Sequence, residues 1–348
     1  MQDRPSKPAD AITLPHREPP GPGAAIAVAP GILWARMPLP LRLNHVNVWL
    51  IEEGDGWIAV DCGLDTPETR AAWDKLAAGP LGGRPVRRLV ATHGHVDHIG
   101  LAGYVTGRFA ATYHATRAAW LWGRVGHLNA GQPTSAAALA FLKSHGVAAA
   151  HVAAYAKDRG VTSRLFGPQP TALHRIEDGD TIAMGGHAWR TIVANGHADD
   201  HASFVSEPAG VLIAGDQVLQ KISPVVGVFA TEPLADPLSA YLASLPRFTA
   251  LDPDQLVLPS HGLPFRGLRP RVAELARHHE MRLDKARAGL DRPRSAVEAS
   301  SALFDASLVE SQWLLTLAET LAHLHRLVTL GEVRREVDAN GRISFARA

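Results

Sequence analysis

The stretch Thr92-His93-Gly94-His95-Val96-Asp97-His98 decides which fold and which chemistry this chain is expected to have. It places three imidazoles and one carboxylate within six residues, directly after the apolar run 86–91. Positions i, i+2, i+4 and i+5 cannot share one helical face, whereas a loop at the carboxyl end of a strand can turn all four side chains inward. Neutral imidazole and carboxylate oxygen are ligands that zinc and similar divalent metals prefer. The stretch therefore predicts a metal-binding loop.

Three further donors lie where later strands are expected to end. His197 follows the run 189–193, Asp216 follows 211–214, and His261 follows 255–258. A glycine beside each donor allows the backbone to approach closely. Together with the loop they make seven donors, five His and two Asp. Seven donors and a shared water suit two metal ions about 3.5–4 Å apart.

The composition limits what kind of protein and metal site this can be. The chain has 348 residues with 18 His but only 1 Cys, which excludes a disulfide framework, a Cys-based zinc finger and a Cys-ligated iron–sulfur cluster. Apolar residues make up 46% and charged residues 20%, as in ordinary globular domains. The formal charge of +1 gives no general reason to bind nucleic acid or an anionic membrane, so a small-molecule substrate is expected.

Residues 1–24 are polar and Pro-rich, and a disordered tail is predicted there. They contain no apolar core of a secretory signal, and nowhere do about 18 apolar residues run uninterrupted. These features predict a cytoplasmic protein with no membrane partner, and they are compatible with a homodimer.

The main domain is predicted to span 25–267 and to alternate strands with helices. Strands are expected at 32–37, 45–52, 57–62, 86–91, 181–184, 189–193, 203–206, 211–214 and 255–258, with helices at 67–76 and 99–109. A helical insertion at 116–163 separates the metal loop from His197. It is either a packing or dimer element, or a lid whose Trp120, Trp122, His127 and Tyr155 wall the substrate pocket.

The C-terminal residues 268–348 have the order of a winged-helix module. Helical periodicity at 272–289 and 308–330 is followed by a hairpin-like piece at 332–345. From residue 269 onward there are thirteen Lys or Arg against eleven Asp or Glu, a surplus of two. That surplus is too small for a DNA-recognition surface, so a structural or dimerising role is expected.

The order and spacing of these motifs over about 25–267 resemble the metallo-β-lactamase superfamily. The resemblance implies an α+β fold, a four-layer αββα sandwich with the metals at one edge. Carried over by position, it implies that metal one is held by His93, His95 and His197, that metal two is held by Asp97, His98 and His261, and that Asp216 bridges both. Asp61 matches the Asp that orients a ligand imidazole in this superfamily.

The bridging Asp216 and the lack of a cysteine ligand point away from true β-lactamases. The metal set is instead similar to that of glyoxalase II, in a branch that carries a C-terminal winged-helix-like module. Two cations sharing one water lower its pKa towards neutrality. A metal-bridging hydroxide would then attack the substrate, and Asp97 is the expected catalytic group that holds or relays its proton. Two Zn²⁺ are the default cofactors, although Mn²⁺ or iron fits the same ligands.

The leading hypothesis is a dinuclear hydrolase that cleaves an ester, a thioester or a lactone. A phosphodiesterase or ribonuclease with the same site is the alternative. An iron-containing sulfur dioxygenase and a metal-binding regulator with a DNA-binding tail are less favoured. His201 is a candidate for contact with a ligand or the substrate because it lies four residues after His197. Lys221, five residues after Asp216, is a candidate partner for an anionic substrate group.

Overall fold

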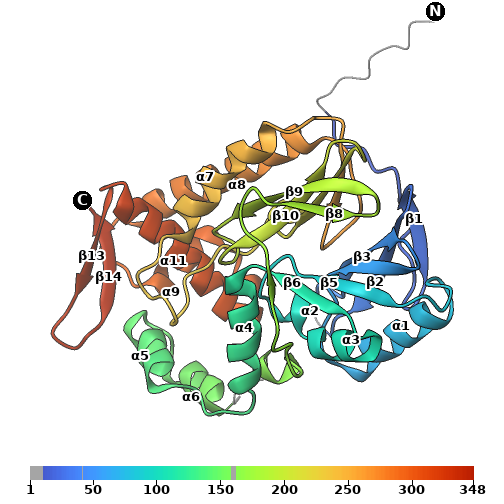
Figure 1. Ribbon diagram of the computed structural model, residues 1–348. Helices are drawn as coiled ribbons and strands as arrows, with labels where there is room; N and C mark the ends of the chain where they lie inside the picture. The colour runs from blue at the N-terminus through green and yellow to red at the C-terminus, as the bar shows by residue number, and fades with distance from the viewer. Residues whose placement is uncertain (1–10, 41, 158–161) are drawn as a thin grey trace, which may run out of the picture.

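The computed structural model describes residues 11–40, 42–157 and 162–348, and two mixed β-sheets packed face to face form its centre (Figure 1). The seven-stranded sheet has the order β1-β2-β3-β4-β5-β6-β7, with strands Ala25–Ala29, Ile32–Pro38, His45–Glu53, Gly56–Val60, Val86–Val90, Thr112–Ala115 and His174–Arg175. The five-stranded sheet has the order β12-β11-β10-β9-β8, with strands Leu256–Pro259, Val211–Gly215, His201–Ser206, His187–Ala194 and Thr181–Met184.

Three apolar cores separate four layers. Between the sheets, Trp34 and Trp49 stack 6.1 Å apart and pack with Phe204 from the opposite sheet. On the outer face of the first sheet, Trp73 of α1 (Pro67–Ala78) and Val105 of α3 (Ala102–Phe109) are buried. Helices α7 (Pro237–Thr249) and α8 (Leu268–Gly289) cover the second sheet and complete the third core. The predicted four-layer α+β sandwich is confirmed.

Parallel pairing brings the predicted donors to one edge of the sandwich. Strands β4 and β5 are parallel, so Asp61 and the loop 92–98 leave the first sheet at the same edge. Strands β11 and β12 are also parallel, so Asp216 and His261 leave the second sheet together. The Ala202 N–H donates to the Thr92 carbonyl at 2.7 Å, which joins the two sheets beside the metal-binding loop.

The helical insertion contains α4 (Arg117–Leu128), α5 (Ala136–Ser144) and α6 (Ala149–Lys157), followed by the 3₁₀ turn η1 (Thr162–Leu165). Part of the predicted insertion, 158–161, lies outside the described residues. The short helix α2 (Val96–Ile99) lies within the metal-binding stretch and α3 follows it, so the single helix expected at 99–109 is divided. Between the two helices, Gly100 lies against other backbone segments, since a Cβ there would lie 2.7 Å from the Leu165 carbonyl oxygen.

A C-terminal module of helices and a β-hairpin is present. It contains α9 (Ala296–Leu303), α10 (Ala306–Ser311), α11 (Trp313–Thr329) and strands β13 (Val333–Val337) and β14 (Ile343–Arg347). Its apolar side chains belong to the same core as α7 and the second sheet. The module is therefore packed onto the sandwich rather than tethered to it.

The prediction of a disordered tail is wrong for residues 11–24. The Thr13 N–H donates to the Arg266 carbonyl at 3.1 Å, and the Arg266 N–H donates back at 2.9 Å. Ile12 and Leu14 also pack against the third core, so apolar burial and backbone pairing hold this segment. The first ten residues of the predicted tail lie outside the described residues. Among the helices that the structure describes, none is long and apolar enough to cross a membrane.

Candidate metal centre

The seven predicted donors meet at the edge where the two sheets join. They form three overlapping groups whose ligand atoms lie within 4.8 Å of one another: His93, His95 and His197; Asp97, His98 and His261; and His93, His98 and Asp216. The first two groups are the two ligand sets that the family resemblance implies. Asp216, in the third, lies between them.

The distances between donor atoms fit ions of the expected size. His93 Nε2 lies 2.9 Å from His95 Nδ1 and 3.3 Å from His197 Nε2. In the second group, Asp97 Oδ2 lies 3.6 Å from His98 Nε2 and 3.4 Å from His261 Nε2. Ligands at 2.0–2.2 Å around a tetrahedral ion lie about 3.3–3.6 Å apart. The donor atoms therefore already have nearly the spacing that a bound ion requires.

Asp216 lies between the first two donor groups. Its Oδ2 lies 3.3 Å from His197 Nε2, a donor of the first group, and 3.3 Å from His261 Nε2, a donor of the second. His98 Nε2 and Asp216 Oδ1 are buried and have no hydrogen-bond partner within the described chain. Buried polar atoms normally have partners, so these two atoms are evidence that a cation belongs here.

The backbone and Asp61 hold the ligand imidazoles so that their Nε2 atoms face the centre. His98 Nδ1 lies 2.8 Å from Asp61 Oδ2. His197 Nδ1 donates to the Val225 carbonyl at 2.8 Å, and His261 Nδ1 donates to the His45 carbonyl at 2.8 Å. Such outer partners fix the tautomer and orientation of a ligand ring. The carbonyl partners carry no sequence signal, because every residue has a carbonyl.

The carboxylates of the centre raise the pKa of two of the candidate ligand imidazoles, His98 and His261. Burial lowers the pKa of His98, but the carboxylates of Asp97, Asp216 and Asp61 outweigh burial and raise that pKa to about 9. Burial also lowers the pKa of His261, but Asp216 and Asp97 raise it well above its usual value. Both imidazoles thus carry protons that a bound cation must displace.

Metal affinity at the second group is expected to depend on pH. A ligand nitrogen must be unprotonated, and His98 is protonated below its pKa of about 9. Affinity should therefore rise at least about tenfold per pH unit up to about pH 9. Competition with a chelator of known proton affinity, repeated across this range, measures the slope. An affinity that did not change between pH 6 and 8 would contradict this account of the charge balance.

His201 supports the bridge rather than the ions. Its Nε2 accepts a hydrogen bond from the Asp216 N–H at 2.9 Å, and the ring lies 4.8 Å from that of His93. Gly215, at φ +58°, leaves room for the ring, since a Cβ there would lie 2.4 Å from His201 Nε2. Burial, with the neighbouring His197, lowers the pKa of His201 to about 3, so the ring is neutral.

Replacing His201 by Leu should destabilise the fold by about 1–3 kcal/mol, because the buried Asp216 N–H loses its acceptor. Metal affinity should fall as well, because Asp216, a proposed metal ligand, is no longer held by His201. His201→Gln retains an acceptor near the Nε2 position and should lose less of both. Urea unfolding and metal titration of the two variants test this, and equal behaviour of Leu and Gln would show that the hydrogen bond is unimportant.

The structure brings only one of the predicted lid residues to the metal-binding loop. Trp122 of α4 packs over Gly94, where a Cβ would lie 2.6 Å from the Trp122 Cβ, and its indole N–H donates to Asp199 at 3.2 Å. Trp122 is 40% exposed, and α4 also exposes Leu121, Val125 and Leu128. These residues form an exposed apolar stripe on α4, which contacts the loop at Trp122.

The other candidates lie elsewhere. The Trp120 indole donates to the Pro170 carbonyl, and His127 hydrogen-bonds the Phe166 carbonyl. Tyr155 packs edge-on against Trp313 of α11, with ring centroids 6.1 Å apart. These three residues therefore fasten the insertion to its neighbours. Lys221 is exposed in the loop after Asp216, and its predicted contact with a substrate remains a prediction.

Comparison with known proteins gives one consistent result. Residues 41–261 match the profile described as "Metallo-beta-lactamase superfamily", and residues 283–348 match "Metallo-beta-lactamase-like, C-terminal domain". The chain is 26% identical over 308 residues to the "Probable metallo-hydrolase YqjP" of Bacillus subtilis, covering 84% of this chain and 91% of that protein.

Two solved structures are similar over nearly the whole chain. A "Beta-lactamase domain protein" from Burkholderia ambifaria is 37% identical, with a TM-score of 0.85, and the match covers 97% of this chain and 99% of that one. A metallo-beta-lactamase family protein from Thermus thermophilus is 31% identical, with a TM-score of 0.78, and the match covers 92% and 100% of the two chains. Both matches therefore include most of the C-terminal module.

Proposed function

This chain belongs to the metallo-beta-lactamase superfamily and is a metallo-hydrolase of that fold, and from this premise we propose that it cleaves an ester, a thioester or a lactone with two bound metal ions. One observation carries the dinuclear proposal: two separate three-residue donor groups lie on either side of one carboxylate, Asp216. No cysteine is among the donors, so Zn²⁺ bound by imidazole and carboxylate is the proposed metal at both positions.

When bound, two divalent cations lower the pKa of water and polarise the group under attack. The chain supplies the rest. Five imidazoles and two carboxylates fix the positions of the ions, and Asp61, Val225 and His45 keep the ligand rings in place. Rigidly held ligands need little reorganisation during the reaction, which is the usual source of electrostatic catalysis.

Asp97 is the proposed proton carrier. It is about one-fifth exposed, at 22%, whereas the Asp216 side chain is 7% exposed. Burial raises the pKa of Asp97, but the charges of His98 and His261 outweigh burial and hold the carboxylate below its usual range. It is therefore ionised at neutral pH, and its exposed edge can hold the proton of an attacking water by a hydrogen bond on the substrate side, although a carboxylate with a lowered pKa is a weak base.

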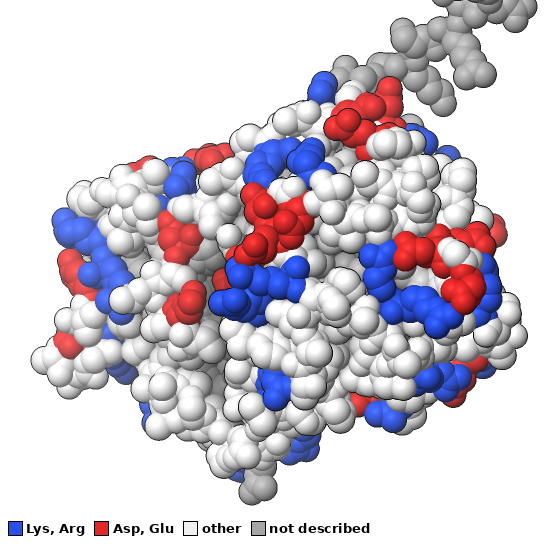
Figure 2. Space-filling view, viewed as in Figure 1, with Lys and Arg blue, Asp and Glu red and all other residues white. Residues whose placement is uncertain are grey.

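The apolar stripe on α4 supports a carbonyl substrate over a phosphodiester. Its exposed side chains, with Trp122 over the metal-binding loop, suit the hydrocarbon part of an ester or thioester. A nucleic-acid substrate would instead favour a continuous basic surface. Figure 2 shows positive and negative groups interspersed on the face it presents.

A panel of substrates tests the proposed function. The metal-loaded protein, with its metal content measured, should hydrolyse aryl esters, acyl thioesters or lactones and should leave bis(4-nitrophenyl) phosphate almost unchanged. Trp122→Ala should raise KM for substrates with long hydrocarbon groups more than for acetyl esters, because apolar contact area is lost. Activity confined to phosphodiesters would overturn the proposal in favour of a phosphodiesterase.

A further inference from the structure

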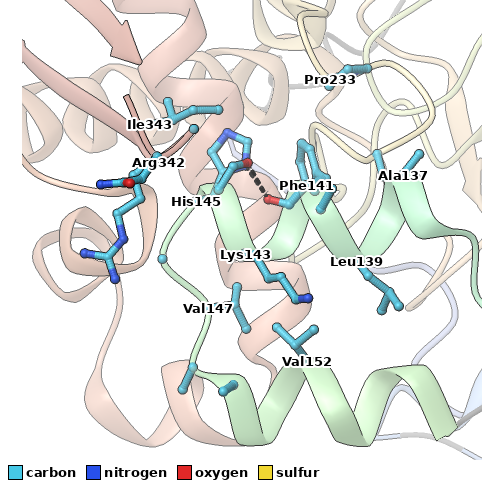
Figure 3. A pocket seen from close by; sticks show the side chains of 18 of the residues that line it. Ala137, Leu139, Phe141, Lys143, His145, Val147, Val152, Pro233, Arg342 and Ile343 are labelled. Carbon is cyan, nitrogen blue, oxygen red and sulfur yellow. Dashed lines mark hydrogen bonds between the residues drawn. The ribbon is translucent and has the colours of Figure 1, made fainter. Parts of the chain in front are cut away.

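A large groove lies between the helical insertion and the C-terminal hairpin (Figure 3). Its volume is 1220 Å³, and it is lined by α5, α6, the segment around Ala230 and Pro233, and residues of β13 and β14. None of its described lining residues is one of the seven metal donors. Pockets for drug-sized ligands have about 300–1,000 Å³, so this groove has room for a long flexible ligand.

The floor of the groove is apolar. Figure 3 shows Leu139, Val147 and Val152 in the space between α5 and α6. Alanines on and between these helices also line it: Ala137, Ala140, Ala148, Ala149, Ala153 and Ala156. Methyl side chains leave the space between the helices unfilled. A hydrocarbon chain could cover this floor and remove it from water.

The charged residues that line the groove are all cationic. They are Lys143, Arg335 and Arg342, and no Asp or Glu is among the described lining residues. None of the three forms an ion pair within the part of the chain that the structure describes, whereas the adjacent Arg334 pairs with Glu336 at 3.4 Å. The side chains that line the groove therefore carry an excess of positive charge. The nearby Asp338 carboxylate does not line the groove and accepts from the backbone N–H groups of Asn340 and Arg342.

Two buried polar atoms at the groove have no partner. His145, 1% exposed, donates from Nδ1 to the Phe141 carbonyl at 2.8 Å, so its Nε2 is left without a hydrogen. That Nε2 and the Nε of Arg335 are both buried without a hydrogen-bond partner in the described chain. Unsatisfied buried groups of this kind are uncommon. The Arg335 Nε–H is a donor that an oxygen atom of a ligand can satisfy, whereas His145 Nε2 is an acceptor and needs a separate donor.

We propose that this groove binds an anionic amphiphile, a long-chain carboxylate whose head group pairs with Arg335 and whose hydrocarbon chain lies between α5 and α6. The guanidinium can donate two parallel hydrogen bonds to a carboxylate. Lys143 and Arg342 add favourable charge at the rim. The proposal does not depend on the reaction at the metal centre, since the two places share no residue.

Calorimetric titration of the metal-loaded protein with dodecanoate, below its micelle concentration, tests the site. One equivalent should bind, decanoate should bind about tenfold more weakly because two methylenes are lost, and dodecanol should also bind at least about tenfold more weakly because it has no charge. Carboxylates can also bind metals, so the titration is repeated on His95→Ala, where affinity for the groove should be unchanged. Equal binding of dodecanol and dodecanoate would overturn the proposal.

Matched variants locate the binding. Arg335→Gln should weaken dodecanoate binding about tenfold, whereas Arg334→Gln on the same strand should change it less than twofold. Ala153→Phe should block the floor, whereas Ala154→Phe, at the adjacent exposed position that does not line the groove, should not. Failure of Ala153→Phe to reduce binding would place the ligand elsewhere and refute the site. Hydrolysis of a short aryl ester should remain unchanged in all four variants, which separates this proposal from the proposed function.

Discussion

Replacing His95 by Ala is expected to lower turnover by at least about a thousandfold while the fold stays intact. Removal of an outer partner of a metal ligand typically costs 10–100-fold, and removal of a ligand itself should cost more. His95 supplies Nδ1 to the first donor group, which would be left with His93, His197 and the bridging Asp216. The bound metal should fall from two equivalents towards one.

The fold should tolerate this change because the His95 side chain supports little else. The residue is exposed, and although it is the N-cap of α2 its side chain makes no capping hydrogen bond. Its loss should change the free energy of unfolding by less than about 0.5 kcal/mol. His187→Ala is the matched control, an exposed imidazole at the far end of β9 from His197. Metal analysis, urea unfolding and ester hydrolysis on both variants give the comparison, and an active His95→Ala with two metals would refute the assignment.

Strand ends made most of the site predictable from the sequence. His93, His197 and His261 each follow an apolar run, and a glycine lies next to each donor or one residue away. Parallel pairing of β4 with β5 and of β11 with β12 directs the ends that precede His93 and His261 to one edge. Strand β9, which precedes His197, runs in the same direction as β11 because each pairs antiparallel with β10. The type of a side chain and its position at a strand end can both be read from nearby residues. One sequence was therefore enough to predict these metal donors.

The partners that hold the ligand rings were not predictable in the same way. The carbonyls of Val225 and His45 lie 28 and 216 residues from the ligands that they hold. Only the folded chain brings them together, and a carbonyl is present at every residue. The role of His201 was open for a related reason, since its contact is to the backbone N–H of Asp216.

The N-terminal segment and the lid were predicted less well because composition does not report tertiary contacts. A Pro-rich, polar stretch is typical of a disordered tail, yet Thr13 pairs with the backbone of Arg266. Of the aromatic residues in the insertion, Trp122 reaches the metal-binding loop while Trp120, two positions along the same helix, turns to Pro170. Residues two apart on a helix face different directions, so a cluster of aromatics in sequence need not wall one pocket.

Asp61→Asn is expected to remove the second metal ion and lower turnover by about 10²–10⁴-fold, although the change replaces one atom. Asp61 Oδ1 accepts from the Thr92 N–H at 2.8 Å, and Oδ2 lies 2.8 Å from both Thr92 Oγ1 and His98 Nδ1. In the variant the amide oxygen must stay with the backbone N–H, so the NH₂ group faces His98. The imidazole must then accept at Nδ1 and carry its hydrogen on Nε2, where it can no longer bind a cation. A wrong tautomer forced by one Asp→Asn change has cost about 10⁴-fold in a serine-protease triad.

The Asp61→Asn variant should keep its fold. A loss of metal and turnover would then be explained by the changed His98 tautomer and not by a damaged structure. Asp61 adopts φ +63°, a left-handed conformation that Asn tolerates nearly as well as Asp, whereas Ala would be strained there. Asp200→Asn is the matched control, because Asp200 also has positive φ, at +47°, and lies in the loop after His197. The control should keep two metals and full turnover. Nitrogen NMR of the histidines should show His98 with its hydrogen on Nε2 in Asp61→Asn. An unchanged His98 tautomer, or retention of two metals with normal turnover, would show that Asp61 is not the residue that sets this ligand.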